Sequence, residues 1–204
     1  MGDGFLNKAY RTRDPEAIRT LYDEWADTYE AEIAANGYVT PDRCAKALAK
    51  YAKDQAAPVL DFGCGTGLSG LALALAGFKV IDGVDLSPEM IDQAREKNVY
   101  RDLATIAPGG KLRHQPGRYG AITAIGVIGA GAAPATVFDM LMQGLGRGGL
   151  LVCSLNDHAI ADRVNEARIN EWTDCGAARL LFREHGDHLP GIDLGACVYV
   201  IEKA

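Results

Sequence analysis

The stretch Val59-Leu60-Asp61-Phe62-Gly63-Cys64-Gly65-Thr66-Gly67 decides the fold of this chain. Its first four residues predict a short buried strand, and the residues after it predict a helix from Leu68 to Ala76 that Gly77 ends. Glycines at three alternate positions let the backbone turn sharply and leave no side chain between the main chain and a ligand. The free N–H groups of the helix start point at the same place. The stretch therefore predicts a loop that holds a small polar molecule against main chain.

Two features indicate which molecule this is. The spacing is G-x-G-x-G rather than the G-x-G-x-x-G of nicotinamide-binding folds, and the acidic Asp61 lies two positions before the first glycine. The next predicted strand, Lys79 to Asp85, ends in a carboxylate that can accept hydrogen bonds from both hydroxyls of an adenosine ribose. A lone glycine motif is also compatible with an ordinary strand–helix turn. Together, the loop and Asp85 favour S-adenosylmethionine over NAD.

Composition is that of an ordinary globular chain. The 204 residues are 48% hydrophobic and 24% charged, which predicts a single domain overall. A net charge of −6 disfavours a nucleic-acid partner, and no apolar run reaches membrane-spanning length. The five cysteines show no C-x-x-C spacing, so we expect small core residues in a reducing compartment. With no signal-peptide pattern, the expected location is cytoplasmic.

Strand and helix patterns alternate along the chain. Such alternation predicts an α/β fold with a mostly parallel sheet and helices on both faces, whose ligands lie at the carboxyl ends of the strands. The predicted strands after Asp85 lie within 103–114, 119–127, 149–155, 179–184 and 196–202, and the predicted helices are 88–97, 134–145 and 157–172.

The N-terminal part carries helices but no predicted strand. We expect residues 1–55 to form a helical extension or lid and residues 56–204 to form the cofactor-binding core. The helix from Asp14 to Asn36 carries an apolar stripe that includes Tyr22, Trp25 and Tyr29. This stripe is first a packing face, and a tyrosine that touches the cofactor is the second interpretation.

The glycine motif, together with Asp85-Leu86-Ser87-Pro88-Glu89-Met90, resembles the class I S-adenosylmethionine-dependent methyltransferases, in particular the Williams–Beuren-region methyltransferase-like branch. The resemblance covers roughly residues 20–155. It implies a Rossmann-like seven-stranded sheet whose last strand is antiparallel. The cofactor-binding residues that it implies are Asp61, Gly63, Cys64, Gly65, Thr66, Gly67, Asp85, Leu86, Met90, Val127, Tyr29 and Tyr22.

Each group of these residues has its own implied role. The loop residues would line the methionine part of the cofactor, and Asp61 would lie near its amino group, directly or through water. Asp85 would hold the ribose, and Leu86 and Met90 would lie against the adenine.

Two departures from this family stand out. The stretch after the third predicted strand, Thr105-Ile106-Ala107-Pro108, has no acid to bind the adenine amino group. The fourth predicted strand begins Tyr119-Gly120-Ala121 rather than aromatic-Asp-Ala, and the loop Val127 to Gly131 after it is apolar. An apolar loop at this place predicts an apolar acceptor pocket.

The sequence offers no residue that we assign to catalysis. His158, just after the fifth predicted strand, is either a substrate contact or a surface residue at a helix start, and we expect His114 to be exposed. His185 and His188 are expected in a solvated turn, with no metal site. The leading function is methyl transfer to a small-molecule acceptor. The alternatives are a non-catalytic S-adenosylmethionine-binding protein and a nicotinamide oxidoreductase.

Overall fold

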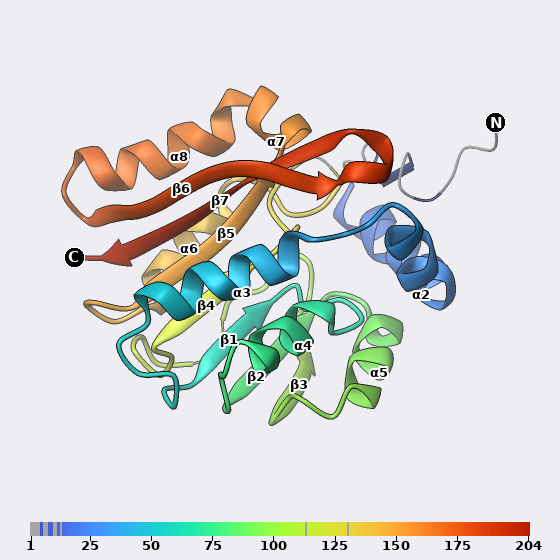
Figure 1. Ribbon diagram of the computed structural model, residues 1–204, viewed down its shortest axis with the longest axis horizontal. Coiled ribbons are helices and arrows are strands. Elements are labelled where there is room, and N and C mark those ends of the chain that lie inside the picture. The colour runs from blue at the N-terminus through green and yellow to red at the C-terminus, as the bar shows by residue number, and fades with distance from the viewer. Residues whose placement is uncertain (1–4, 6–7, 10–11, 13, 113, 130) are drawn as a thin grey trace.

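The fold is an α/β sandwich, seen here in a computed structural model that describes residues 5, 8–9, 12, 14–112, 114–129 and 131–204 (Figure 1). Its strands are β1 Val59–Phe62, β2 Ile81–Asp85, β3 Asp102–Thr105, β4 Ala121–Ala124, β5 Leu150–Asn156, β6 Ala178–Leu189 and β7 Leu194–Lys203. Its helices are α2 Pro15–Ala35, α3 Thr40–Tyr51, α4 Leu68–Leu75, α5 Pro88–Glu96, α6 Val137–Gly144, α7 Asp157–Ala161, α8 Arg163–Asp174 and the short 3₁₀ helix η1 Pro190–Ile192.

All seven strands form one sheet in the order β3-β2-β1-β4-β5-β7-β6. The five strands from β3 to β5 pair in parallel, whereas β7 runs antiparallel to both β5 and β6. The predicted Rossmann-like sheet with an antiparallel last strand is therefore confirmed. The order reverses between β1 and β4, so the carboxyl ends of these two strands border the ligand crevice that such sheets provide.

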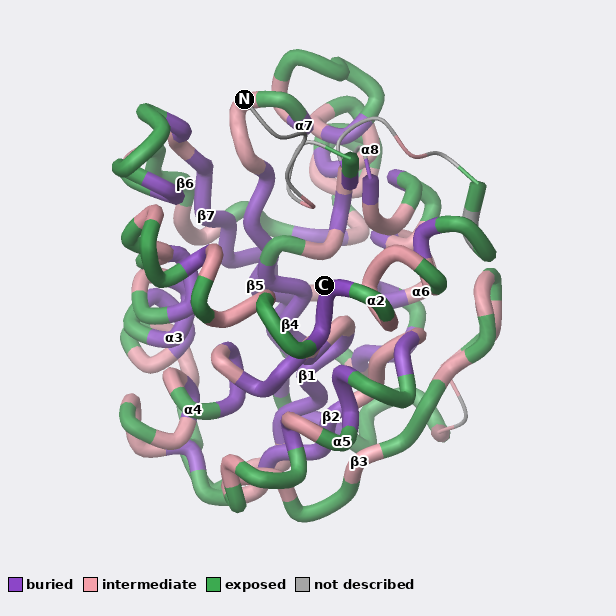
Figure 2. The backbone as a smooth tube through the Cα atoms, turned by 90° about the vertical axis from the view of Figure 1, so that its right-hand side faces the viewer, coloured by how far each residue is buried: buried purple, intermediate pink, exposed green. Residues whose placement is uncertain are grey.

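Helices cover both faces of the sheet, and the buried strands lie between them (Figure 2). On one face α3 and α4 pack over Val59, Ile81 and Val200. On the other face α6 and α8 form a second core. Among the described residues, no helix combines the length and apolar character needed to cross a membrane.

Several boundaries differ from those expected. The helix expected over 157–172 is two helices, because the Asp162 side chain caps a new one by accepting a hydrogen bond from the N–H of Val164. The strand expected to end at Glu184 continues to Leu189, because β6 pairs with β7 along this whole length. His185 and His188 therefore lie on a strand, and the prediction of a solvated turn is wrong.

The two N-terminal helices have different places in the fold. Helix α3 packs on the sheet through the buried Cys44 and Leu48, so it belongs to the layered core. Helix α2 lies beyond the carboxyl edge of the sheet, at one side of the molecule (Figure 1). Its buried Trp25 packs with Leu189 and Leu194 from the β6–β7 hairpin. The division of the chain at residue 55 stays a prediction.

Candidate active site

The glycine loop follows β1 directly and has the conformation that its sequence predicts. Gly63, Gly65 and Gly67 have φ angles of 70°, 52° and 93°, a region that side-chain-bearing residues rarely adopt. A Cβ atom on Gly63 would lie 2.4 Å from a Val127 methyl group, so the loop packs against the segment after β4. A Cβ atom on Gly65 would meet no protein atom within 4 Å. Gly65 is thus where the loop faces open space.

Asp85 ends β2 and holds the glycine loop by its main chain. Its carboxylate accepts hydrogen bonds from the N–H of Gly65 at 2.8 Å and from the N–H of Ser87 at 3.0 Å. Desolvation by burial raises the pKa of Asp85, while these two N–H groups act in the opposite direction. The structure brings Asp85 and Gly65 together, as the motif predicts. The contact of Asp85 with a ribose stays a prediction.

Asp61 lies directly beneath the loop and is fully buried. Its carboxylate accepts hydrogen bonds from Ser69 Oγ at 2.6 Å, Thr123 Oγ1 at 2.8 Å and Tyr100 OH at 2.8 Å. Desolvation by burial raises the pKa of Asp61, and the three hydroxyl groups oppose that rise. Asp61 therefore joins β1, β4 and α4 under the loop. Its contact with the cofactor amino group stays a prediction.

Tyr100 completes this network and is a residue that sequence reasoning missed. Its hydroxyl donates to Asp61 and accepts a hydrogen bond from the N–H of Gly70 in α4 at 3.0 Å. Burial and the Asp61 carboxylate raise the pKa of Tyr100, so the hydroxyl keeps its proton. The available signal was an aromatic residue between α5 and β3, in a segment that is otherwise mostly polar.

The other predicted cofactor residues differ in what they expose. Cys64 is 3% exposed, with its Sγ close to Gly83 of β2, so only its main chain borders the loop. Leu86 is half-buried, whereas Met90 is 1% exposed and belongs to the core beneath α5. Thr66 Oγ1 is buried and makes no hydrogen bond within the described part of the chain. An unpaired hydroxyl beside open space at Gly65 fits a polar ligand such as S-adenosylmethionine.

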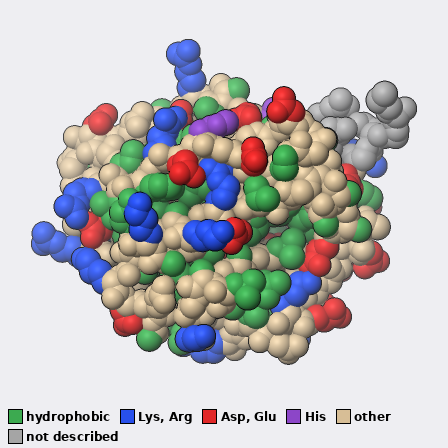
Figure 3. Space-filling model, in the orientation of Figure 1, with side chains coloured by type: hydrophobic (Ala, Val, Ile, Leu, Met, Phe, Trp, Pro, Cys, Tyr) green, Lys and Arg blue, Asp and Glu red, His purple; other side chains and the backbone are tan. Residues whose placement is uncertain are grey.

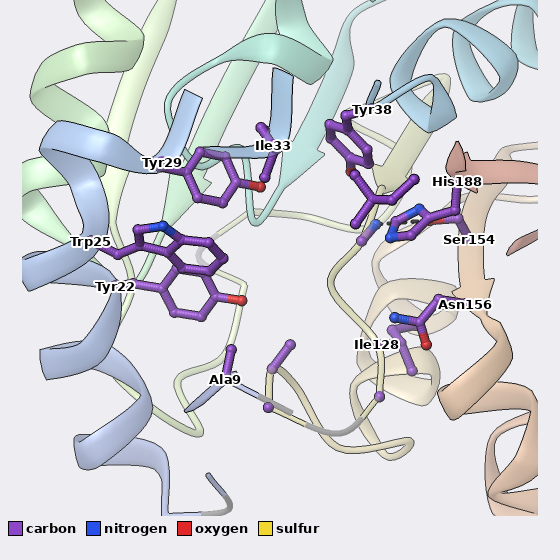
Figure 4. Close-up of a pocket in the computed structure, with 15 residues that line it drawn as sticks. Ala9, Tyr22, Trp25, Tyr29, Ile33, Tyr38, Ile128, Ser154, Asn156 and His188 are labelled. Atoms are coloured by element: carbon purple, nitrogen blue, oxygen red, sulfur yellow. Dashed lines mark hydrogen bonds between the residues drawn. The ribbon is translucent and has the colours of Figure 1, made fainter. Parts of the chain in front are cut away.

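A second feature, which we call the aromatic pocket, lies between α2 and the carboxyl ends of β4, β5 and β6 (Figure 4). Tyr22, Trp25 and Tyr29 project from α2 on one side, and His188 projects from β6 on the other. The described residues that line it are Ala9, Tyr22, Trp25, Tyr29, Ile33, Tyr38, Gly126, Ile128, Gly129, Gly131, Ala132, Ser154, Asn156, His188 and Leu189. Residues of the loop after β4 line this pocket, although Ala130 lies outside the described residues, and its use as an apolar acceptor pocket stays a prediction.

Three of the four histidines lie differently from what the sequence suggested. His188 is 6% exposed and lines the aromatic pocket, and desolvation lowers its pKa to about 4. His185 is exposed and its Nε2 lies 2.8 Å from Asp157 Oδ1. His114 is half-buried rather than exposed, with its ring edge-on to Tyr119. His158 is exposed on α7 and is not among the residues that line the pocket, so it fits the surface residue at a helix start. The described residues contain no cluster of three His, Cys, Asp or Glu that could hold a metal.

Helix α2 is attached to the surroundings of the glycine loop as well as to the pocket. Glu30 forms an ion pair with Lys97 at the end of α5, with 2.7 Å between Oε1 and Nζ. The stem of Lys97 lies against Gly67, and Leu68 packs into the same apolar cluster as Trp25. The helix therefore bridges the glycine loop and the aromatic pocket.

Comparison with known proteins agrees with this geometry. A family model described as a methyltransferase domain matches residues 36–197. Human methyltransferase-like protein 27 is 31% identical over 124 residues, which cover 59% of this chain and 51% of that protein. The ubiquinone biosynthesis O-methyltransferase of Xylella fastidiosa is 29% identical over 160 residues, which cover 76% of this chain and 64% of that protein.

The fold itself recurs in solved structures. Magnesium protoporphyrin IX methyltransferase of Synechocystis, solved with bound S-adenosylhomocysteine, superposes with a TM-score of 0.71 over 94% of this chain and 100% of that one, at 16% identity. The chain spans about half the length of its human relative and under two thirds of the bacterial one. The family match covers most of the chain, and the sheet order and glycine loop agree with it. The chain belongs to the class I S-adenosylmethionine-dependent methyltransferases.

Proposed function

We propose that this chain transfers a methyl group from S-adenosylmethionine to a small-molecule acceptor that binds in the aromatic pocket. One observation carries the acceptor class. The pocket is roofed by α2 and lined largely by aromatic and small apolar residues. A macromolecule presents its reactive atom through an open face, whereas a roofed aromatic pocket favours a compact acceptor with a flat apolar part.

The residues on the cofactor side have proposed roles that follow from their positions. We assign the methionine end of the cofactor to Gly65 and Thr66, where the loop faces open space. Asp85 would accept the ribose hydroxyls while it keeps the loop in place, and Leu86 would cover the adenine. Val127 touches Gly63 and belongs to the loop that lines the pocket, so it lies where the two ligands would meet.

When it is bound, S-adenosylmethionine supplies an activated methyl group, so the protein must mainly position the reactants and exclude water. Tyr22 and Tyr29 on α2 face the pocket and are placed to do both. The bacterial O-methyltransferase among the relatives supports a hydroxyl-bearing acceptor. The acid missing after β3 suggests a different adenine contact, rather than loss of binding.

Surface charge also favours a small acceptor over a nucleic acid. The chain carries a net charge of −6. On the face seen in Figure 3, basic and acidic side chains are interspersed and form no continuous basic surface. We further propose a cytoplasmic location, because the five cysteines are unpaired and four of them are buried.

The test is S-adenosylhomocysteine release over a panel of small phenols, thiols, amines and carboxylates, run beside isothermal titration with S-adenosylmethionine and NAD. Binding with product from at least one small acceptor supports the proposal. Cofactor binding without turnover on the panel would favour the non-catalytic binding protein. Turnover only with ribosomal RNA or protein would move the acceptor class to macromolecules. Binding of NAD alone would favour an oxidoreductase.

A further inference from the structure

Among the described residues that line the aromatic pocket, His188 is the one side chain that offers a basic nitrogen lone pair at neutral pH. The other polar side chains there are tyrosine hydroxyls, the Trp25 indole, Ser154 and Asn156, and none of them is a carboxylate, lysine or arginine. Ser154 is already engaged, because its Oγ accepts a hydrogen bond from the N–H of Gly126 at 2.8 Å. A reaction that must remove a proton from its acceptor has His188 as its candidate base.

The imidazole is held in one orientation by residues from α3 and the turn before it. Its Nδ1 lies 2.7 Å from Oγ1 of Thr40, which is fully buried. The Tyr38 ring packs edge-on at 5.2 Å between ring centroids, and the His188 carbonyl accepts a hydrogen bond from the N–H of Val39. Nε2 receives no hydrogen bond from the described residues, and the ring projects toward the cavity (Figure 4).

We propose that His188 is a catalytic residue whose Nε2 takes the proton of a phenol-like acceptor during methyl transfer; this rests on the proposed function. In this assignment Nδ1 carries its hydrogen toward Thr40 Oγ1, which leaves the Nε2 lone pair facing the acceptor. The acceptor oxygen forms a bond to the methyl carbon, and the carbon–sulfur bond breaks with its electron pair left on sulfur. The hydroxyl proton moves to Nε2, so atoms and charge balance.

The charge balance suits this environment. Burial keeps the imidazole neutral at pH 7 and its lone pair available, since desolvation lowers the pKa of His188 to about 4. A weak base of this kind works because the positive charge of the sulfonium disappears as the imidazolium forms, so the closed pocket carries one positive charge before and after the step. The charged or titratable groups that act on His188 are Asp157, which raises its pKa, and Arg43 and His158, which lower it.

The experiment compares two acceptors in the full chain with saturating S-adenosylmethionine at mildly alkaline pH. Phenol keeps its proton there, whereas thiophenol is largely ionised and needs no base. The test variant is His188→Asn, because the Asn amide can replace Nδ1 toward Thr40 but places nothing at Nε2. The matched control is His185→Asn, on the same strand but exposed and outside the pocket lining.

For His188→Asn we expect kcat with phenol to fall at least about 100-fold, kcat with thiophenol to change less than about threefold, and the Kd for S-adenosylhomocysteine to stay unchanged. His185→Asn should behave as wild type with both acceptors. An equal loss with both acceptors, or no loss with phenol, overturns the role of His188 while methyl transfer stands. A wild-type chain that methylates neither probe overturns the proposed function, and this inference falls with it.

Thr40 provides a second measurement. Thr40→Val removes the partner of Nδ1 and should lower kcat with phenol but not with thiophenol, whereas Thr40→Ser should restore it. If Thr40→Ser fails to restore phenol turnover in a folded protein, the assigned orientation of the imidazole is wrong.

Discussion

The two halves of the site, the glycine loop with its supports and the aromatic pocket, are built in different ways. The loop half comes mostly from one stretch of chain, residues 59–100, with Thr123 added from β4, and its polar groups are fixed by hydrogen bonds such as those to Asp61 and Asp85. The pocket half brings together α2, residues 126–129 and 131–132, and the ends of β5 and β6, and α2 is held there mainly by apolar packing. Directional bonds fix one geometry, whereas packing through a few aromatic side chains allows opening.

This difference matters because the proposed function gives the halves different tasks, cofactor binding to the loop half and acceptor binding to the pocket half. A cofactor common to the whole family needs the same contacts in each member, and a hydrogen-bonded loop supplies them. An acceptor pocket must admit its ligand and then exclude water. We therefore expect mutations in the loop half to have large and specific effects on cofactor binding, and those in the pocket half to affect turnover and motion.

The sharpest way to break the comparison is Gly65→Val. We expect S-adenosylmethionine affinity to fall more than about 500-fold, because a side chain strains the left-handed backbone and occupies the open space that the ligand needs. Isothermal titration measures the loss. Gly148→Val is the control: Gly148 also has positive φ and open surroundings but precedes β5 at the other edge of the sheet. Equal binding by both variants would show that the loop is not the cofactor site.

Acid sensitivity probes the pocket half. His188 has a folded pKa of about 4 against an ordinary 6.5, so between these values the unfolded chain binds a proton that the folded chain does not. The contribution of His188 to the free energy of unfolding should therefore be fully present above pH 6.5. It should be lost, by roughly 3 kcal/mol, as the pH drops from 6.5 to about 4. Urea unfolding of wild type and His188→Asn across this range isolates the contribution. If the free energy of unfolding of His188→Asn depends on pH as that of wild type does, while His185→Asn loses this dependence, the low pKa does not belong to His188.

Asp85→Ala tests the proposed contact of the loop half with the ribose of the cofactor. We expect S-adenosylmethionine affinity to fall by roughly 2–3 kcal/mol, or about 30–150-fold, since two hydroxyl bonds and the anchor of Gly65 are lost together. Asp102→Ala, an exposed acid at the start of the adjacent strand β3, should bind as wild type does. A folded Asp85→Ala protein with wild-type affinity would refute the role of Asp85.

Tyr100→Phe tests how much the buried hydrogen bonds beneath the glycine loop contribute to stability. The change leaves the N–H of Gly70 without its acceptor and removes one of three donors to Asp61. The free energy of unfolding should drop by about 1–2 kcal/mol, measured by urea denaturation. Tyr51→Phe is the control, because its ring packs on Phe182 and no described group bonds its hydroxyl. Equal stability of both variants would mean that the buried network contributes nothing.

The smallest expected effect is a change in amide exchange in helix α2, which tests whether the pocket opens. We expect amide exchange in α2 to slow about tenfold when S-adenosylhomocysteine binds, because the helix touches the glycine loop through Leu68 and Lys97. Exchange in α8, which takes no part in the pocket, should not change. Equally slow exchange in α2 with and without ligand would make it a fixed element rather than a lid.

Sequence patterns predicted the sheet and the loop half well, because their signals are local. A glycine at positive φ, a strand-end acid and a helix cap such as Ser87 are each readable within a few residues. The hydrogen bond between Tyr100 and Asp61 could not be predicted from local patterns, because 39 positions separate the two residues. His188 was misread because His-Gly-Asp-His has the composition of a turn, and pairing with β7 overrides that preference.

The packing of Trp25 against Leu189 and Leu194 also has a consequence for the order in which the molecule is made. Helix α2 leaves the ribosome long before the hairpin that covers its apolar face. During that interval Trp25 has its neighbours Tyr22 and Tyr29 on α2 but lacks its contacts with Leu189 and Leu194, while β1 to β5 can already assemble next to one another. We therefore expect the pocket to form after the parallel strands of the sheet. A chain that ends before the β6–β7 hairpin would keep the glycine loop, but the apolar face of α2 would stay exposed and would be a binding site for chaperones.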